Sequence, residues 1–231
     1  MSWRCRIQYT LAVVVLLAPT VAQAKGETAT LRIYLARHGQ TDWNAAHRLQ
    51  GNTNTHLNAT GREQATALAA RLAGVHFEHA YCSRLSRTQE TAAILLTGRH
   101  VPIDSLAGLN EQNFGRFQGL RTDTSDAIAA EWRRRSADPT DSLDGGESLE
   151  MLSARVSATV ERIRHRHKGG NILIVGHGGS NKMVLLDLFH LTMEQADSIQ
   201  QGNDELYLIE MDATGPPRLF KLIAEGNLKE L

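Results

Sequence analysis

The sequence predicts an α/β protein, a three-layer α/β/α sandwich around a mainly parallel sheet. Apolar runs short enough for strands alternate along the chain with longer amphipathic stretches, which is the order of βα units. Of the 231 residues, 42% are hydrophobic and 22% are charged, a composition typical of a globular protein with a full core. No long linker, internal repeat or low-complexity tract divides residues 25–231, so we expect one domain there.

The elements expected in the first half of this domain follow short apolar runs and helix-start signals. They are strands over 31–36, 79–82 and 101–104 and helices that begin near Thr60 and Ser86. Thr60 and Ser86 each stand three positions before a residue, Glu63 and Gln89, that can complete a capping box. The helix after Thr60 carries two leucines four residues apart on one face.

The second half continues the alternation with further helices and strands. It predicts helices over 124–134, 148–165 and 181–189, a short helix capped by Thr192, and strands over 172–175, 205–211 and 219–223. The run over 172–175 is short and wholly apolar, as in a strand at the centre of a parallel sheet. The last two strands are expected to form an edge hairpin across 212–217.

The first 24 residues have the pattern of a secretory signal peptide. Arg4 and Arg6 form a basic start, residues 11–18 are apolar, and Ala22-Gln23-Ala24 has the small-x-small order of a cleavage site. We expect cleavage near Ala24 and a periplasmic or secreted protein without a stable membrane anchor. A retained anchor is the alternative, but the apolar run is much shorter than the roughly 20 residues that span a bilayer.

Charge and cysteine content narrow the function further. Removing the leader takes away two of the 25 basic residues and none of the 25 acidic ones, which argues against a partner made of nucleic acid. Of the two cysteines, Cys5 lies in the leader, so the mature chain cannot close an internal disulfide. We interpret Cys82, at the end of a predicted strand, as a buried small side chain.

Two histidines stand beside glycines directly after predicted strands. His38 follows the strand over 31–36, and His177 follows the strand over 172–175. Because loops at the carboxyl ends of the strands build the binding crevice of an open α/β sheet, these histidines are expected to meet there. Arg37 and Arg87 also follow predicted strands, and the fork of an arginine binds phosphate oxygens in pairs. The pattern predicts a phosphoryl-transfer site.

Five segments together resemble the histidine phosphatase superfamily, in the branch that contains cofactor-dependent phosphoglycerate mutases and related phosphatases. They are residues 37–44, with the Arg-His-Gly signature, and residues 83–92, 109–115, 145–148 and 175–179, in the order of the family. The resemblance covers about residues 31–223 and implies a phosphoglycerate mutase-like fold. It also implies phosphoryl transfer through a phosphohistidine, without a metal or an organic cofactor.

The resemblance implies a role for each matched residue. It implies that His38 attacks phosphorus and that Glu111 protonates the leaving oxygen, then accepts a proton from water. The side chains expected to hold the phosphoryl oxygens are those of Arg37, Asn44, Arg87 and His177. Further candidates for the substrate pocket are Gln40, Thr41, Gly51 and Gly178.

Some of these assignments have rivals. Glu147 and Asp104 lie near other loops and compete with Glu111 for the role of the acid, although Glu147 suits a helix start, where a negative charge meets the helix dipole. His165 and His167 alternate with basic residues at a predicted helix end, and we interpret them as a solvated cap rather than a metal site.

Two other functions compete with a phosphomonoesterase that acts on a small phosphorylated substrate. The first is a cofactor-dependent phosphoglycerate mutase. Mutases carry a longer insertion between the positions of Glu111 and His177, which here are 66 positions apart, and Gln40 replaces the glutamate common in mutases. The second is a non-catalytic protein that binds a phosphorylated ligand, but such a protein needs no acid for a leaving group. The natural substrate and the oligomeric state stay open.

Overall fold

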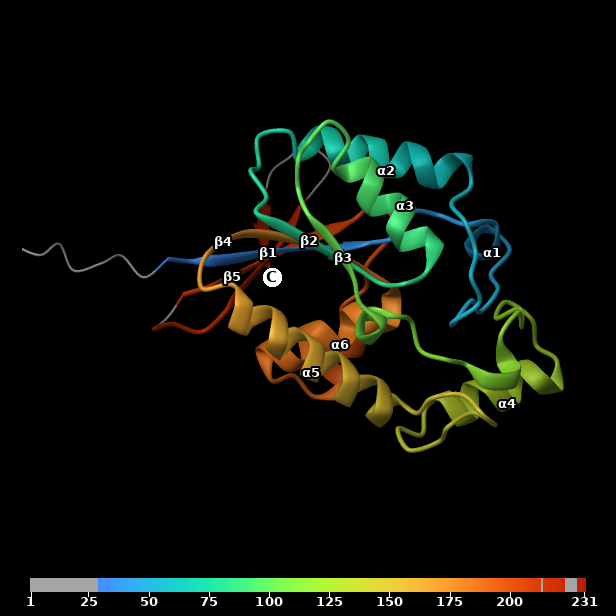
Figure 1. Ribbon diagram of the computed structural model, residues 1–231. Helices are drawn as coiled ribbons and strands as arrows, with labels where there is room; N and C mark the ends of the chain where they lie inside the picture. The colour runs from blue at the N-terminus through green and yellow to red at the C-terminus, as the bar shows by residue number, and fades with distance from the viewer. Residues whose placement is uncertain (1–28, 213, 223–227) are drawn as a thin grey trace, which may run out of the picture.

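The computed structural model describes residues 29–212, 214–222 and 228–231, so the predicted leader over 1–24 lies outside the described residues. These residues form the expected three-layer α/β arrangement, with a central sheet between two layers of helices (Figure 1). No helix in the described ranges has the length and apolar character needed to cross a membrane.

The sheet has seven strands, in the order β3-β2-β4-β1-β5-β6-β7. The strands are β1 (Leu31–Arg37), β2 (His79–Cys82), β3 (Ile103–Ser105), β4 (Gly170–Gly176), β5 (Leu206–Met211), β6 (Arg218–Leu222) and β7 (Leu228–Glu230). The four strands from β3 to β1 pair in parallel, and the remaining three join them by antiparallel pairing. The apolar strand β4 lies between β2 and β1, which confirms its predicted place inside the parallel part of the sheet.

The helices cover both faces of this sheet. They are α1 (Asp42–Ala45), α2 (Ala59–Arg71), α3 (Ser86–Leu95), α4 (Ala127–Ser136), α5 (Leu149–Arg166), α6 (Gly178–Phe189) and α7 (Met193–Ser198), with short 3-10 helices at Ala107–Leu109 and Gly115–Phe117. Figure 1 shows α2 and α3 on one face and α5 and α6 on the other. Helix α4 lies apart from these layers, on the side where β1 ends.

Two hydrophobic cores follow from the alternation of side chains along the strands. On β1, Ile33 and Leu35 face the core that contains α5 and α6, whereas Ala36 and the partly buried Tyr34 face the core of α2 and α3. Burial of one such aliphatic side chain stabilises the fold by about 1.5–3 kcal/mol. Cys82 is buried in the second core, as predicted.

The sequence placed the start of α2 incorrectly. The helix begins at Ala59, and its cap is Asn58, whose side-chain oxygen accepts the N–H of Gly61 at 2.9 Å. The prediction of Thr60 as the cap was therefore wrong. The reason is a tertiary contact, because the Asn58 backbone N–H donates to the carbonyl oxygen of Gln40 at 3.0 Å and thereby fixes the chain direction before the helix.

Helix α3 begins at the predicted residue but without the predicted capping box. Its N-cap position is Leu85, which has no side-chain oxygen. The free N–H groups are satisfied from outside the helix, since the N–H of Ser86 donates to Asn54 Oδ1 at 2.8 Å and the N–H of Leu85 donates to Ser83 Oγ at 3.1 Å. The remaining predicted elements are present, with ends shifted by at most three residues.

The predicted hairpin of the last two strands is present as β5 and β6, but it is not at the edge of the sheet. The strand β7 (Leu228–Glu230) pairs antiparallel with β6 and forms that edge instead. Its residues include a lysine and a glutamate and carry no run of apolar residues, so no local pattern predicts this strand.

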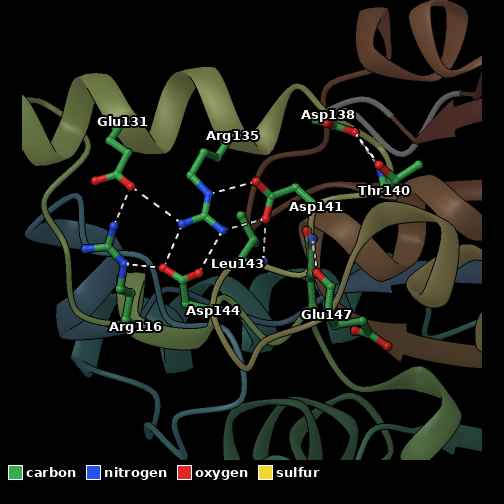
Figure 2. A network of polar contacts seen from close by, with 10 residues as sticks. Arg116, Glu131, Arg135, Asp138, Thr140, Asp141, Leu143, Asp144 and Glu147 are labelled. Carbon is green, nitrogen blue, oxygen red and sulfur yellow. Dashed lines mark hydrogen bonds and ion pairs between the residues drawn. The ribbon is translucent and has the colours of Figure 1, made fainter.

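Residues 114–146, which we call the cap segment, contain α4 and are held together by ionic and aromatic contacts. Figure 2 shows Arg135 of α4 between the carboxylates of Asp141 and Asp144. Its guanidinium donates two hydrogen bonds of 2.7 Å to Asp141 and bonds of 2.7 and 3.0 Å to Asp144. The ring of Trp132 packs against Phe114 with centroids 5.1 Å apart. Arg135 therefore belongs to an ion-pair network within the cap segment.

Candidate active site

The two histidines of the glycine motifs meet at the carboxyl ends of β1 and β4. Their ring centroids are 5.1 Å apart, and the backbone N–H of His38 donates to the carbonyl oxygen of Gly176 at 3.0 Å. Both side chains are buried. The parallel pairing of the two central strands therefore brings together residues that are far apart in the sequence.

The ring of His38 is oriented by its own neighbour. Its Nδ1 lies 2.8 Å from the carbonyl oxygen of Gly39, so Nδ1 carries the proton and Nε2 keeps its lone pair. Burial lowers the pKa of His38 well below 6.5, and the positive charges of Arg87 and Arg37 lower it further. The side chain is therefore a neutral imidazole whose Nε2 can act as a nucleophile.

The ring of His177 is bonded at both nitrogens within the protein. The Nε–H of Arg87 donates to Nδ1 at 3.2 Å, and Nε2 lies 2.8 Å from Ser83 Oγ. Burial lowers its pKa well below the ordinary value, and nearby arginines and His38 add to this effect. To bind a phosphoryl oxygen, His177 would have to exchange the contact with Ser83, a residue that sequence reasoning did not single out for this position.

Arg87, at the start of α3, is fully buried without a carboxylate partner among the described residues. Its Nη1 and Nη2 donate to the backbone carbonyl oxygens of Thr53 and Gly51, both at 2.8 Å. Burial lowers the pKa of Arg87 to about 10, opposed by the charge of Glu111, so the guanidinium keeps its proton at neutral pH. Its charge is thus available to a bound anion.

Arg37, at the end of β1, has an unused donor. Its Nη1 donates to the carbonyl oxygen of Gln201 at 2.6 Å, but its buried Nε has no partner among the residues that the structure describes. A buried donor without an acceptor costs free energy, on the order of 1–3 kcal/mol. An anion at this position would supply the acceptor.

Glu111 is held at the N-terminus of α6 by backbone N–H groups. Its carboxylate oxygens accept hydrogen bonds from Gln112 at 2.9 Å, Gly179 at 3.1 Å and Ser180 at 3.2 Å. A Cβ atom at Gly179 would lie 2.4 Å from Glu111 Oε1, closer than atoms can approach. The glycine at position 179 is therefore required for the approach of this carboxylate.

The other predicted residues differ in how they contact the site. Asn44 accepts hydrogen bonds from the N–H and hydroxyl of Thr41 through its side-chain oxygen, both at 3.1 Å, which shapes the turn before α1. Gln40 is turned away, because its side-chain oxygen accepts from Asn58 at the start of α2. Gly51 has a φ of +52°, which favours glycine, and its carbonyl oxygen accepts from Arg87.

A pocket of about 170 Å³ joins most of these groups. It is lined by Arg37, His38, Asn44, Arg48, Leu49, Gln50, Gly51, Arg87, Glu111 and Phe114. Of the predicted residues, His177, Gln40, Thr41 and Gly178 do not line it. Arg48, Leu49, Gln50 and Phe114 were missed; three of them belong to the segment between α1 and α2, and Phe114 belongs to the cap segment.

The rival carboxylates are engaged elsewhere. Glu147 forms two hydrogen bonds, of 2.6 and 2.7 Å, with Arg155. Asp104, on β3, contacts His79 at 2.9 Å and is absent from the pocket lining. His167 is not simply solvated as expected, since its Nε2 lies 2.8 Å from the hydroxyl of Tyr81.

No group of three or more histidine, cysteine, aspartate or glutamate side chains with the spacing of a metal site occurs within the described ranges. His165 pairs instead with Glu161 on the same helix.

Comparison with known proteins supplies the family. A model of the histidine phosphatase superfamily (branch 1) matches residues 33–221, which include the two histidines, both arginines and Glu111. The chain belongs to this superfamily. A protein of Escherichia coli O1:K1 described as the probable phosphoglycerate mutase GpmB is 36% identical over 152 residues, which are 64% of this chain and 70% of that protein.

Several solved structures share the fold of this histidine phosphatase. The α-ribazole phosphatase of Shigella flexneri has a TM-score of 0.71 and 29% identity, and the match covers 79% of this chain and 91% of that chain. A mycobacterial glucosyl-3-phosphoglycerate phosphatase in complex with VO3 has a TM-score of 0.71 and 30% identity, and the match covers 81% of this chain and 96% of that chain. The phosphoserine phosphatase of Entamoeba histolytica has a TM-score of 0.69 and 25% identity, and the match covers 82% of this chain and 94% of that chain. The family and these neighbours identify the chain as a phosphatase-type enzyme.

Proposed function

We propose that this histidine phosphatase is an exported phosphomonoesterase that hydrolyses small phosphate esters through a phosphohistidine at position 38. The observation that carries the proposal is the pairing in one pocket of a neutral imidazole with a free Nε2, on His38, and an unpartnered buried donor, on Arg37. A tetrahedral anion placed between these groups would satisfy the donor and present phosphorus to the nucleophile.

In the first step, the lone pair of His38 Nε2 forms a bond to phosphorus while the bond from phosphorus to the ester oxygen breaks. The carboxyl group of Glu111 gives its proton to the departing oxygen, so that an alcohol leaves. Negative charge spread over the peripheral phosphoryl oxygens is stabilised by nearby cations and N–H donors. We assign this work to Arg37, Arg87 and Asn44, and to His177 once its bond to Ser83 is exchanged.

In the second step, water attacks the phosphohistidine. The Glu111 carboxylate, left ionised by the first step, accepts a proton from the water, the phosphorus–nitrogen bond breaks, and inorganic phosphate leaves. The neutral imidazole is regenerated, and the enzyme returns to its starting protonation state. No step requires a metal ion or an organic cofactor.

A phosphoglycerate mutase is the second candidate, because of the identity to the GpmB protein. A mutase must hold a bisphosphorylated cofactor and protect its phosphohistidine from water. The fold is shared with three solved phosphatases and with a solved phosphoglycerate mutase of Bacillus anthracis, so it does not separate the two functions. The pocket volume is well below the roughly 300–1,000 Å³ of sites for drug-sized ligands. The small pocket favours hydrolysis of a small monoester over binding of a bisphosphorylated cofactor.

The enzymatic proposal is tested with the purified mature chain, residues 25–231, and p-nitrophenyl phosphate. Turnover by the wild type, loss of turnover in His38→Ala with an unchanged circular dichroism spectrum, and phosphate label on the wild-type chain after alkaline quenching are expected. Turnover that disappears with EDTA and returns with zinc would contradict the metal-independent route. A parallel assay measures the isomerisation of phosphoglycerate in the presence of bisphosphoglycerate. A mutase would isomerise phosphoglycerate faster than it hydrolyses it, whereas a phosphatase would not.

Export is tested separately. The support is the leader pattern over 1–24, with small residues before the expected cleavage position. Expression of the full chain in a Gram-negative host, followed by fractionation and intact-mass measurement, is expected to give a periplasmic protein that begins at Lys25. A membrane-bound product whose intact mass includes residues 1–24 would show that the leader is retained as an anchor.

A further inference from the structure

The loop over residues 199–205, between α7 and β5, contacts the main chain of β1 at the point where that strand ends. The antiparallel ladder between β1 and β5 extends to the pair of Ala36 and Leu206. Beyond this pair a side chain of the loop takes the place of a strand, because Asn203 Nδ2 donates to the carbonyl oxygen of His38 at 2.7 Å. The loop therefore continues the hydrogen bonding of the sheet as far as the proposed nucleophile.

The peptide group between His38 and Gly39 is held at both of its polar atoms. Its carbonyl oxygen accepts from Asn203, and its N–H donates to Thr91 Oγ1 at 3.1 Å. The hydroxyl of Thr91 donates in turn to the carbonyl oxygen of Arg87 at 2.7 Å, so its oxygen serves as the acceptor for this N–H. Two separate elements, α3 and the loop before β5, thus fix the orientation of one peptide group.

The ring of His38 depends on the orientation of this peptide group. His38 Nδ1 donates to the carbonyl oxygen of Gly39 at 2.8 Å, one peptide group further along the chain. If the peptide between the two residues turned, the Gly39 carbonyl would move with it and Nδ1 would lose its acceptor. The ring proton could then reside on Nε2, and the nitrogen that we assign as the nucleophile would have no lone pair.

The loop that presents this amide is itself anchored. The side chain of Glu205 accepts the N–H of Gly202 at 2.8 Å and forms an ion pair with Lys221 of β6 at 2.6 Å. Gln201 Nε2 donates to the carbonyl oxygen of Leu35 at 2.9 Å. A side chain on an anchored backbone can hold its acceptor in one position, which a side chain on a loose loop cannot do.

A purely structural role is the alternative, and the fold contains a contact of that kind for comparison. Asn171 Nδ2 donates to the carbonyl oxygen of His76 at 2.9 Å, at the opposite end of the sheet, where β1 and β4 begin. The chemistry of the two contacts is the same. They differ in the acceptor, because only Asn203 contacts the main chain of the residue that carries the proposed nucleophile.

We propose that Asn203 is a positioning residue for the nucleophile, whose amide fixes the peptide between His38 and Gly39 and so keeps the ring proton on Nδ1 and the lone pair on Nε2. The inference rests on the proposed phosphatase function and adds a residue that acts on the chemical step. Asn203 is not among the described residues that line the pocket, so its loss should spare the binding of phosphate.

The test compares Asn203→Leu with Asn171→Leu, because leucine approximates the shape of asparagine and has no donor. The measurements are kcat for p-nitrophenyl phosphate, Ki for inorganic phosphate, and the melting temperature. We expect Asn203→Leu to lower kcat roughly tenfold or more and to leave Ki within about threefold of the wild type. Asn171→Leu should keep kcat within about twofold, even where its melting temperature falls. Asn203→Ala repeats the test if the leucine variant does not fold.

Long-range 1H–15N spectra give a second readout, because they distinguish the two neutral tautomers of a histidine. The signals of His38 are identified by their absence from the spectrum of His38→Ala. We expect the Nδ1-protonated tautomer in the wild type and in Asn171→Leu, and a growing share of the Nε2-protonated tautomer in Asn203→Leu. A merely structural role would leave the tautomer unchanged.

The outcomes separate the two proposals. If the wild type hydrolyses p-nitrophenyl phosphate but kcat of Asn203→Leu stays within about threefold of it, the role of Asn203 is wrong and the phosphatase function stands. The same conclusion follows if His38 keeps the Nδ1-protonated tautomer in that variant, if Ki rises as much as kcat falls, or if Asn171→Leu loses as much kcat. Absence of turnover by the wild type overturns the phosphatase function, and the role of Asn203 in it.

Discussion

The active-site pocket and the cap segment use arginine in opposite ways. Arg87 in the pocket is fully buried, and its donors go to two backbone carbonyl oxygens and an imidazole nitrogen. Arg135 in the cap segment is more exposed, and its guanidinium forms ion pairs with two carboxylates, Asp141 and Asp144 (Figure 2). Among the described residues, no carboxylate lies within ion-pair distance of Arg87, whereas Arg135 contacts two.

The pKa values of the neighbouring groups reflect this difference. In the cap segment the hydrogen bonds from Arg135 lower the pKa of Asp141 to about 2, and the carboxylates raise the pKa of Arg135. In the pocket, burial lowers the pKa of Arg87 to about 10 and keeps both histidines neutral. The carboxylates of the cap segment compensate the charge of Arg135, whereas the role that we propose for the charge of Arg87 is to bind the phosphoryl group of the substrate.

The largest expected effect on activity comes from replacing Arg87 and Arg135, one at a time, by lysine. Arg87→Lys should lower kcat/KM for p-nitrophenyl phosphate at least tenfold, about 1.4 kcal/mol, because a lysine cannot reproduce the forked donors. Arg135→Lys should leave kcat/KM within twofold. Steady-state kinetics together with melting curves check both variants, and similar losses of activity in the two would remove the contrast between the regions.

A second experiment tests how the pocket holds its single acid. Gly179→Ala places a methyl group 2.4 Å from Glu111 Oε1, so the carboxyl group must move, and kcat for an alkyl phosphate should fall roughly ten- to a hundredfold. Gly178→Ala is the control, since its new Cβ meets nothing closer than 3.7 Å, at Arg37. Equal rates for the two alanine variants would show that Glu111 needs no fixed position.

The pH dependence of the reaction sharpens the comparison further. A histidine with the ordinary pKa of 6.5 is about 90% protonated at pH 5.5 and would lose about tenfold in rate as a nucleophile. Because burial and two arginines lower the pKa of His38, the neutral form persists below pH 6.5. We expect kcat/KM to fall by less than about threefold between pH 7 and pH 5.5, and a tenfold fall would mean that burial and the two arginines do not keep His38 neutral.

The smallest expected effect is on stability and concerns the ion pair between Arg135 and Asp141 in the cap segment. The lowered pKa of Asp141 means that its contribution to stability is complete above the unfolded value of 3.8 and is lost as the pH falls through about 2. Asp141→Asn should lower the melting temperature at pH 7 by no more than about 4 °C, because exposed ion pairs contribute little. Its melting temperature should also fall less steeply than that of the wild type between pH 4 and pH 2, and parallel curves would contradict the assignment.

Much of this architecture could be predicted from the sequence, because local patterns determine it. The apolar run of β4 and the glycine motifs around His38 and His177 identify the central strands and their loops, and the family motifs add Glu111 and Arg87. The start of α2 could not be predicted, because Asn58 caps it through a backbone contact with Gln40.

The rim of the pocket was also missed, for a related reason. Arg48 reaches the pocket only because its segment pairs with residues 119–122 of the cap segment, more than 60 positions away. The same holds for the contact between Ser83 and His177, which lie 94 positions apart. Such contacts have no local signature, so the residues at the rim of the pocket are harder to predict than the residues of the family motifs.

Cys82 gives this enzyme a built-in reporter of unfolding. It is buried in the core beneath α2 and α3, and burial raises the pKa of its thiol, so both access and the fraction of reactive thiolate are low in the native protein. Cys82 is the one cysteine in residues 25–231, so a thiol reagent can label a chain that begins at Lys25 only when this core opens. The rate of labelling over a range of reagent concentrations therefore measures the free energy of opening without any engineered probe.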